Sequence, residues 1–190
     1  EPGAYYAVLL SGDSSLSGSF PHADFSLNAV EDRLYLYENG RLADYVHLID
    51  IPNLESMGRL PENGGFFYME PTPLEDNLSG WRTISERPSL SAAGSIYSGN
   101  DALTVSLSAP GSVYYTLDGS TPTPESARYE SPIPIGESCV LRAAAFEDGK
   151  RGSETVSASY MIGTEHSMPI VSLTADPSEL FGNAGIRLFA

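Results

Sequence analysis

The chain has 190 residues, of which 41% are apolar, and a formal charge of −15 from 25 acidic and ten basic side chains. These apolar residues are enough to bury a core, and the many aromatic and β-branched residues argue against disorder. The acidic balance argues against nucleic acid or an anionic membrane as partner, since both require clustered Lys and Arg. The only lysine is Lys150.

The sequence also lacks the patterns of several other classes of protein. No apolar run approaches ~20 residues and no signal peptide opens the chain, so we expect no membrane insertion. Cys139 is the only cysteine and can form neither an internal disulfide nor a multi-thiolate zinc site. The acidic residues do not have the Asp-x-Asp-x-Asp-Gly spacing of a calcium loop, so we expect no metal and no cofactor.

Short apolar runs that alternate with a period of two, separated by Gly, Pro, Asn, Asp and Ser, predict an all-β fold. In chain order, the predicted strands cover residues 5–10, 25–27, 33–37, 42–48, 66–69, 103–107, 113–117, 140–146, 155–161 and 170–174. One helical turn is predicted over 177–181, where Asp176 can cap Pro177. This spacing favours two small sandwiches over one barrel, with the boundary in the Ser-, Ala-, Gly- and Pro-rich stretch 84–98.

The predicted strands over 33–37 and 42–48 are expected to pair as a hairpin. A two-residue Asn39-Gly40 loop and a three-residue loop over 38–40 are both conceivable. Only the three-residue loop gathers the aliphatic side chains on one face, namely Leu34, Leu36, Leu42, Val46 and Leu48. Because burial fixes register, we expect the three-residue loop, with Gly40 left-handed in a bulge.

This register has a consequence for one carboxylate. It turns Asp44 inward, and a buried carboxylate must be paired or hydrogen-bonded. We expect backbone N–H groups, Ser56 or Arg59 around it, in a structural and not a catalytic role. The opposite face would carry Arg33, Tyr35, Tyr37 and Tyr45.

Four segments of the first half form a recognisable series. They are LYLYENGRLAD over 34–44, SMGR over 56–59, ENGG over 62–65, and PTP over 71–73 followed by Asn77. Together they resemble the later part of lamin-tail domains, although Leu74 stands where that family usually has Gly. The resemblance covers about residues 20–80. It implies an immunoglobulin-like sandwich, found in nuclear lamins and secreted bacterial proteins, and a first domain over 1–84.

A second series of motifs runs from Val113 to Tyr160. It consists of VYYTLDGSTPT over 113–123, Tyr129-x-x-Pro-Ile133, VLRAAAF over 140–146, Gly149, Ser153 and Tyr160. This series resembles the small domain at the C-terminus of chitobiases and related hexosaminidases, also called fibronectin-III-associated, and implies a second sandwich over 85–163. Within it, Asp118 is expected to accept N–H bonds from the following turn and Gly119 to adopt a positive φ, both as architecture.

The last segment, MPIVSLTADPSELF over 168–181 with Gly185-Ile186, resembles the opening of spore-coat-kinase-like (CotH-type) domains. In bacterial proteins of that kind, a lamin-tail module and a chitobiase-type module often come first, in the order found here. Residues 164–190 are therefore expected to be a linker and the beginning of a following domain. We expect 167–175 to lie extended against or just beyond the second sandwich.

Together, these resemblances favour a non-catalytic accessory or interaction module of a secreted or cell-surface bacterial protein that positions a downstream domain of the same chain. No catalytic residues are expected, because His22, His47 and His166 lie in different predicted elements and no nucleophile elbow or phosphate loop is present. The expected partner is an unknown protein or a cell-wall glycan.

The alternative is a carbohydrate-binding module. Sugar binding requires exposed aromatic rings beside polar groups, and coplanar exposed rings would favour it, whereas rings packed on one another would favour a scaffold. The candidate glycan contacts are Tyr35, Tyr37, Tyr45, the aromatic run 66–68, Trp81 and Tyr114.

Overall fold

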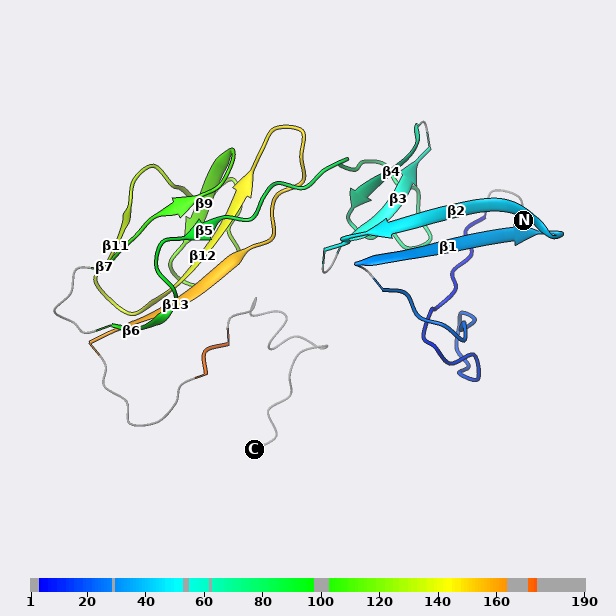
Figure 1. Cartoon of the computed structure of the whole chain (residues 1–190), viewed down its shortest axis with the longest axis horizontal. Coiled ribbons are helices and arrows are strands. Elements are labelled where there is room, and N and C mark those ends of the chain that lie inside the picture. The colour runs from blue at the N-terminus through cyan, green and yellow to red at the C-terminus, as the bar shows by residue number, and fades with distance from the viewer. Residues whose placement is uncertain are drawn as a thin grey trace. The chain divides into compact units, whose positions relative to one another are not determined.

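The structure is a computed structural model and describes residues 4–28, 30–52, 55–61, 63–97, 103–163 and 171–173. The chain divides into two compact units, Glu1–Thr83 and Ile84–Ala190. All regular elements of the described residues are β-strands (Figure 1), so the prediction of an all-β fold is confirmed. None of the described residues forms a helix with the length and hydropathy needed to span a bilayer.

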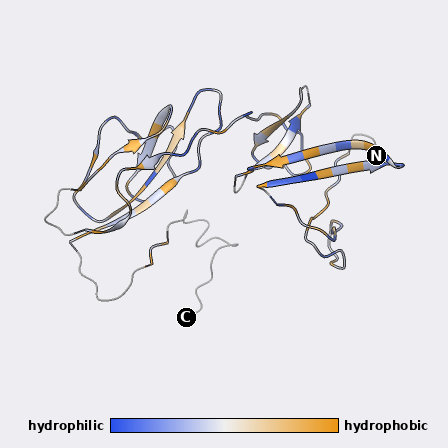
Figure 2. Cartoon of the chain, in the orientation of Figure 1, coloured by the Kyte–Doolittle hydropathy of each residue, from blue (hydrophilic) through white to orange (hydrophobic). Residues whose placement is uncertain are grey.

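The described part of the first unit contains two antiparallel ribbons. β1 (Glu31–Glu38) pairs with β2 (Arg41–Ile49), and β3 (Ser56–Leu60) pairs with β4 (Asn63–Met69). Hydrophobic and hydrophilic residues alternate along β1 and β2, as Figure 2 shows, and this alternation separates the two faces of the ribbon. The strands predicted over 5–10 and 25–27 are wrong, because the described residues before β1 form only an isolated bridge, between Leu9 and His22.

The turn of the β1–β2 hairpin also differs from the prediction. Glu38 pairs with Arg41, which leaves Asn39-Gly40 as a two-residue loop. Both loop residues have positive φ, +50° at Asn39 and +75° at Gly40, as a type I′ turn requires. The three-residue loop is therefore wrong. The physical reason is that the twist of a type I′ turn matches the right-handed twist of the flanking strands.

A bulge further along β2 restores the alternation of faces. Leu36 pairs with Asp44 while Tyr37 pairs with Leu42, so Ala43 is the extra residue. The bulge keeps Asp44 on the aliphatic face but leaves Leu42 on the face of Tyr37. Leu36, at the end of the aliphatic face, is 63% exposed. The predicted inward position of these two leucines is wrong, because the turn chemistry and the bulge together set the register.

The second unit contains nine short strands among its described residues. They are β5 (Ser89–Leu90), β6 (Ser95–Tyr97), β7 (Leu103–Val105), β8 (Leu107–Ser108), β9 (Ser112–Thr116), β10 (Ala127–Arg128), β11 (Ile133–Ile135), β12 (Cys139–Phe146) and β13 (Val156–Ile162). One layer is a five-stranded sheet in the order β10-β9-β12-β13-β6, in which β6 runs parallel to β13. The ribbons β5–β8 and β11–β7 form the facing layer, since only Ser106 separates β7 from β8.

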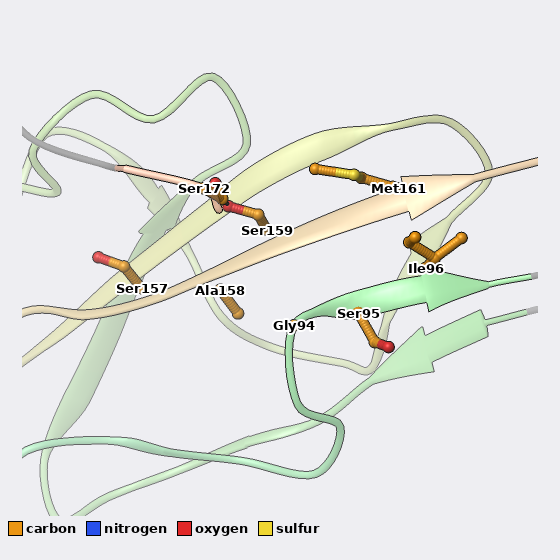
Figure 3. Close-up of a pocket in the computed structure, with 8 residues that line it drawn as sticks. All are labelled: Gly94, Ser95, Ile96, Ser157, Ala158, Ser159, Met161 and Ser172. Carbon is orange, nitrogen blue, oxygen red and sulfur yellow. Dashed lines mark hydrogen bonds between the residues drawn. The ribbon is translucent and has the colours of Figure 1, made fainter. Parts of the chain in front are cut away.

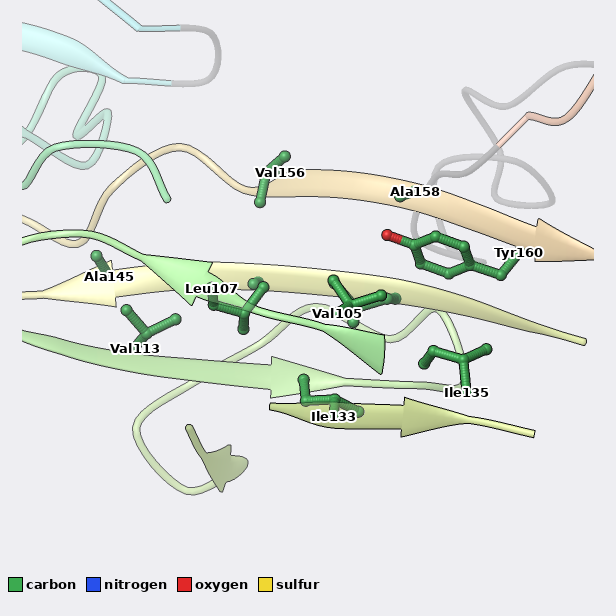
Figure 4. Packing of buried hydrophobic residues seen from close by; sticks show 11 residues of the cluster. Val105, Leu107, Val113, Ile133, Ile135, Ala145, Val156, Ala158 and Tyr160 are labelled. Carbon is green, nitrogen blue, oxygen red and sulfur yellow. The ribbon is translucent and has the colours of Figure 1, made fainter. Parts of the chain in front are cut away.

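The core of the second unit lies between these layers (Figure 4). It consists of inward-facing residues of β7, β8, β9, β11, β12 and β13, namely Val105, Leu107, Val113, Ile133, Ile135, Leu141, Ala143, Ala145, Val156, Ala158 and Tyr160. The Tyr160 hydroxyl is buried and donates a 2.7 Å hydrogen bond to the Ala92 carbonyl. Burial raises the pKa of Tyr160 to about 12.

The turn after β12 contains an ion pair, in which Lys150 Nζ donates to Glu147 Oε2 at 2.8 Å.

Residues 171–173 are the described part of the segment after β13. The Ser172 and Ser159 hydroxyl oxygens lie 2.6 Å apart, within an open groove of about 680 Å³ beside β13 and β6 (Figure 3). A Cβ on Gly94 would lie 2.9 Å from the backbone N and O of Ser159. Glycine at this position therefore allows the backbone just before β6 to approach β13 closely. Residues 171–173 do not form a strand. The other residues of the predicted strand over 170–174 and the turn over 177–181 lie outside the described residues.

Candidate functional site

One face of the β1–β2 hairpin carries three tyrosines. Tyr35 pairs directly with Tyr45, and their ring centroids lie 6.4 Å apart with an angle of 25° between the ring planes. Tyr37 is two residues further along β1 and therefore shares this face. The exposed fractions of Tyr35, Tyr37 and Tyr45 are 48%, 63% and 56%. We call these three side chains the tyrosine face.

Polar residues border the tyrosine face at the end away from the turn. Arg33 pairs with His47, two positions beyond the Tyr35–Tyr45 pair and therefore on the same face. His47 Nε2 lies 3.8 Å from a carboxylate oxygen of Glu31. At the turn end the border is the exposed Leu42. The surface therefore has an aromatic centre with hydrogen-bonding groups at one end.

The opposite face of the hairpin is held to β3 by an ion pair. Arg59 Nη1 and Nη2 donate to Asp44 Oδ2 and Oδ1 at 2.5 and 2.6 Å, and the guanidinium lies 4.5 Å from the Phe66 ring centroid. Asp44 is not buried as expected, because its side chain is 46% exposed. The bonds from Arg59 and from the Tyr45 N–H lower the pKa of Asp44 below its ordinary value. Ser56 is not a partner of Asp44, because its hydroxyl donates to a carbonyl of β4.

The Asp44–Arg59 pair predicts a pH dependence of stability. Because the pKa of Asp44 is lowered by folding, the pair stabilises the folded state above the unfolded pKa of about 3.9, and this stabilisation is lost as the pH falls through the folded pKa. Asp44→Asn should lower the urea midpoint at pH 7 and reduce its fall between pH 5 and pH 2. The matched control is Asp24→Asn, which removes an exposed carboxylate of the same unit. An unchanged acid profile in Asp44→Asn would contradict this assignment.

The loop after β4 is tied to the backbone of β3. Asn77 Nδ2 donates to the Arg59 carbonyl at 2.8 Å, and Asn77 Oδ1 accepts from the Thr72 hydroxyl at 2.7 Å. A Cβ on Gly58 would lie 2.7 Å from Asn77 Nδ2, so this contact requires glycine on β3. The position of Asn77 after the Pro-Thr-Pro segment is therefore explained by packing.

The aromatic run 66–68, Trp81 and Tyr114 do not belong to the tyrosine face. The run lies on β4, where Phe67 is buried. Trp81 pairs through its backbone with Tyr68, with N···O distances of 2.8 Å in both directions. Its side chain lines a separate cavity of about 310 Å³ with Met69, Thr72, Asn77, Leu78, Ser79 and the carboxylates of Glu70, Glu75 and Asp76. Tyr114, in the second unit, packs edge-on against Phe146 with centroids 5.6 Å apart. A half-buried ring in such a pair is typical of a scaffold.

The Asp118 loop of the second unit is held by a residue that sequence analysis did not single out. Asp118 Oδ1 accepts from the Ser120 hydroxyl at 2.6 Å and its N–H at 3.0 Å, which lowers the pKa of the carboxyl, and Gly119 has a φ of +81°. In addition, Arg142 Nη1 donates to the Gly119 carbonyl at 3.1 Å and to Thr121 Oγ1 at 3.2 Å. Arg142 is on β12, 21 residues or more from its partners in sequence, so spacing carries no signal for this contact.

The described residues contain no cluster of three or more His, Cys, Asp and Glu side chains that could hold a metal ion. Cys139 packs at the edge of the core cluster, and burial raises the pKa of its thiol, with a smaller contribution from Glu137. The tyrosine face brings together three of the candidate glycan contacts.

Comparison with known families concerns the second unit. Residues 91–157 match the family model of the chitobiase/beta-hexosaminidase C-terminal domain. That family is a non-catalytic accessory domain with an immunoglobulin-like fold, found in extracellular glycosidases. The match runs from just before β6 into β13 and includes the Asp118 loop. No curated protein matches the chain. The lamin-tail and spore-coat-kinase resemblances lie outside the matched residues.

Proposed function

We propose that the chain is a non-catalytic accessory module of a secreted or cell-surface protein, in which it positions a downstream domain. The family match over 91–157 carries this proposal, because the matched family is a non-catalytic accessory domain. The contact between Ser172 and Ser159 is a second support, because it holds Ser172 against β13. The proposal includes a lamin-tail-like domain over 1–84, a chitobiase-type domain over 85–163, and a linker with the start of a CotH-type domain over 164–190.

Positioning can be tested with a fluorescent reporter domain joined after Ala190. If the segment after β13 docks on the second unit, the reporter should tumble with the chain, and its anisotropy should decay slowly. The control replaces residues 164–190 by a Gly/Ser linker of equal length, which behaves as a flexible coil. Equal decay rates in the two proteins would contradict positioning. Hydrolysis of any polysaccharide by the chain, in a screen of released reducing ends, would contradict the non-catalytic role.

Carbohydrate binding is a second candidate function, favoured by the tyrosine face. Its three aromatic rings are exposed together on one face, and contiguous exposed apolar patches mark interaction sites. A glycan array, together with sedimentation with insoluble polysaccharides and cell-wall material, tests this function. Retention on at least one defined glycan at micromolar concentration is the expected result.

A further inference from the structure

We propose that the tyrosine face binds a neutral, unbranched polysaccharide whose chain lies along the direction of β1 and β2. Sugar rings would stack on Tyr35 and Tyr45 and continue over Tyr37, with their hydroxyls directed to Arg33. This inference rests on the carbohydrate-binding function proposed above, and it names the surface and the class of ligand.

The first argument is the shape of the aromatic surface. The Tyr35 and Tyr45 rings are stacked, with an angle of 25° between their planes and 6.4 Å between their centroids, and both remain about half exposed. Tyr37 extends this surface along β1 by two residues, about 6.8 Å. Because the ribbon is only two strands wide in the described residues, the surface is long and narrow. A linear chain of rings fits such a surface better than a compact ligand does.

The second argument is the chemistry of the exposed groups. The negative faces of aromatic rings attract the slightly positive C–H groups of a sugar, and tyrosine loses little conformational entropy on binding because it has two χ angles. The phenol hydroxyls and the exposed Arg33 add donors and acceptors at the margin. A wholly apolar partner would bury these polar groups without hydrogen bonds, which costs free energy. A polyol avoids this cost because its hydroxyls can bond to them.

The third argument is charge. Residues 1–85 contain 13 acidic residues and four arginines, a balance of −9. A polyanion, such as a uronic-acid polymer or a phosphodiester-linked wall polymer, would be repelled by this field, whereas a neutral chain is not. Among polysaccharides, the face therefore selects neutral ones.

The experiment measures retention of the chain on a panel of neutral polysaccharides and on uronic-acid polymers of similar length. Tyr35→Ala/Tyr45→Ala should weaken binding to the neutral ligand by about tenfold or more, as expected for central contacts of an interface. Tyr35→Phe/Tyr45→Phe should keep most of the binding, because the rings remain. The matched control is Tyr6→Ala, which removes an 80% exposed tyrosine of the same unit. Circular dichroism and Trp81 fluorescence report whether each variant is folded.

A second measurement requires no variant. Tetranitromethane nitrates exposed tyrosines, and mass spectrometry of the wild-type chain can follow each site. Bound polysaccharide should protect Tyr35, Tyr37 and Tyr45 several-fold but leave Tyr6 unprotected. The assignment of the ligand would be overturned if only a uronic-acid polymer protected these tyrosines. It would also be overturned if they were protected without polysaccharide, by self-association of the chain at high concentration.

The outcomes separate this inference from the function on which it rests. If the chain binds a neutral polysaccharide and the tyrosine variants bind equally well, the tyrosine face is the wrong surface but carbohydrate binding stands. Loss of binding in Trp81→Ala alone would place the site in the cavity after β4. If no polysaccharide is retained, both the inference and the carbohydrate-binding function fail.

Discussion

Replacing Leu141 by alanine is expected to lower the free energy of unfolding of the second unit by about 2–5 kcal/mol. Leu141 is fully buried in β12, which pairs with β9 on one side and β13 on the other. The substitution removes buried apolar surface and leaves a cavity that surrounding strands cannot close without breaking their ladders. For a unit of this size, the loss corresponds to a fall of at least about 8 °C in Tm.

Thermal and urea unfolding monitored by circular dichroism measure this effect. The control is Leu117→Ala, which shortens an exposed leucine next to β9 and should cost less than about 1 kcal/mol. Equal losses in the two variants would mean that the cluster around Leu141 is not the core that holds the second unit together.

A pair of glycine substitutions separates backbone strain from steric exclusion. Gly111 and Gly149 have nearly the same backbone conformation, with φ of +76° and +74°. A Cβ on Gly149 would have no atom within 4 Å, whereas a Cβ on Gly111 would lie 2.6 Å from the Phe146 carbonyl oxygen. Gly149→Ala should therefore cost about 1–2 kcal/mol for the left-handed conformation alone. Gly111→Ala should cost about 1–3 kcal/mol more, because the β9 and β12 ends must move apart.

Equilibrium urea unfolding of both variants under one set of conditions gives the difference directly. If Gly111→Ala were no more destabilising than Gly149→Ala, the Phe146 carbonyl would have to be free to shift, and the close approach of these strands would have no energetic role. A larger loss in Gly149→Ala would contradict the argument from the left-handed conformation.

The strands that the sequence predicts well are those with a long alternation. The runs over 140–146 and 155–161 correspond to β12 and β13, which lie side by side within the larger sheet. The strands β5, β6, β10 and β11 have two or three residues each, too few to show a period, so only the tertiary pairing defines them. β3 was missed because its sequence, SMGRL, packs through Gly58 and Arg59 and not through alternating apolar residues.

The β1–β2 hairpin shows how two local rules can compete. Burial of every leucine favours a three-residue loop, whereas Asn39-Gly40 favours a two-residue turn. The structure has the two-residue turn, and the bulge at Ala43 restores the aliphatic face from Asp44 onward. The shared face of the tyrosines and the partnership of Asp44 with Arg59 could be anticipated because both depend on strand alternation. The exposure of Leu36 could not be anticipated, because strand alternation gives the face of a residue but not whether another layer covers it.

The lone lysine gives the chain an uneven chemical reactivity. Lys150 is in the second unit, beside Glu147, and the first unit has no lysine at all. Amine-directed reagents therefore find a single side chain to modify, and it lies in a different unit from the tyrosine face. A chain attached to a solid support through Lys150 would keep all three tyrosines unmodified and available to a polysaccharide in solution.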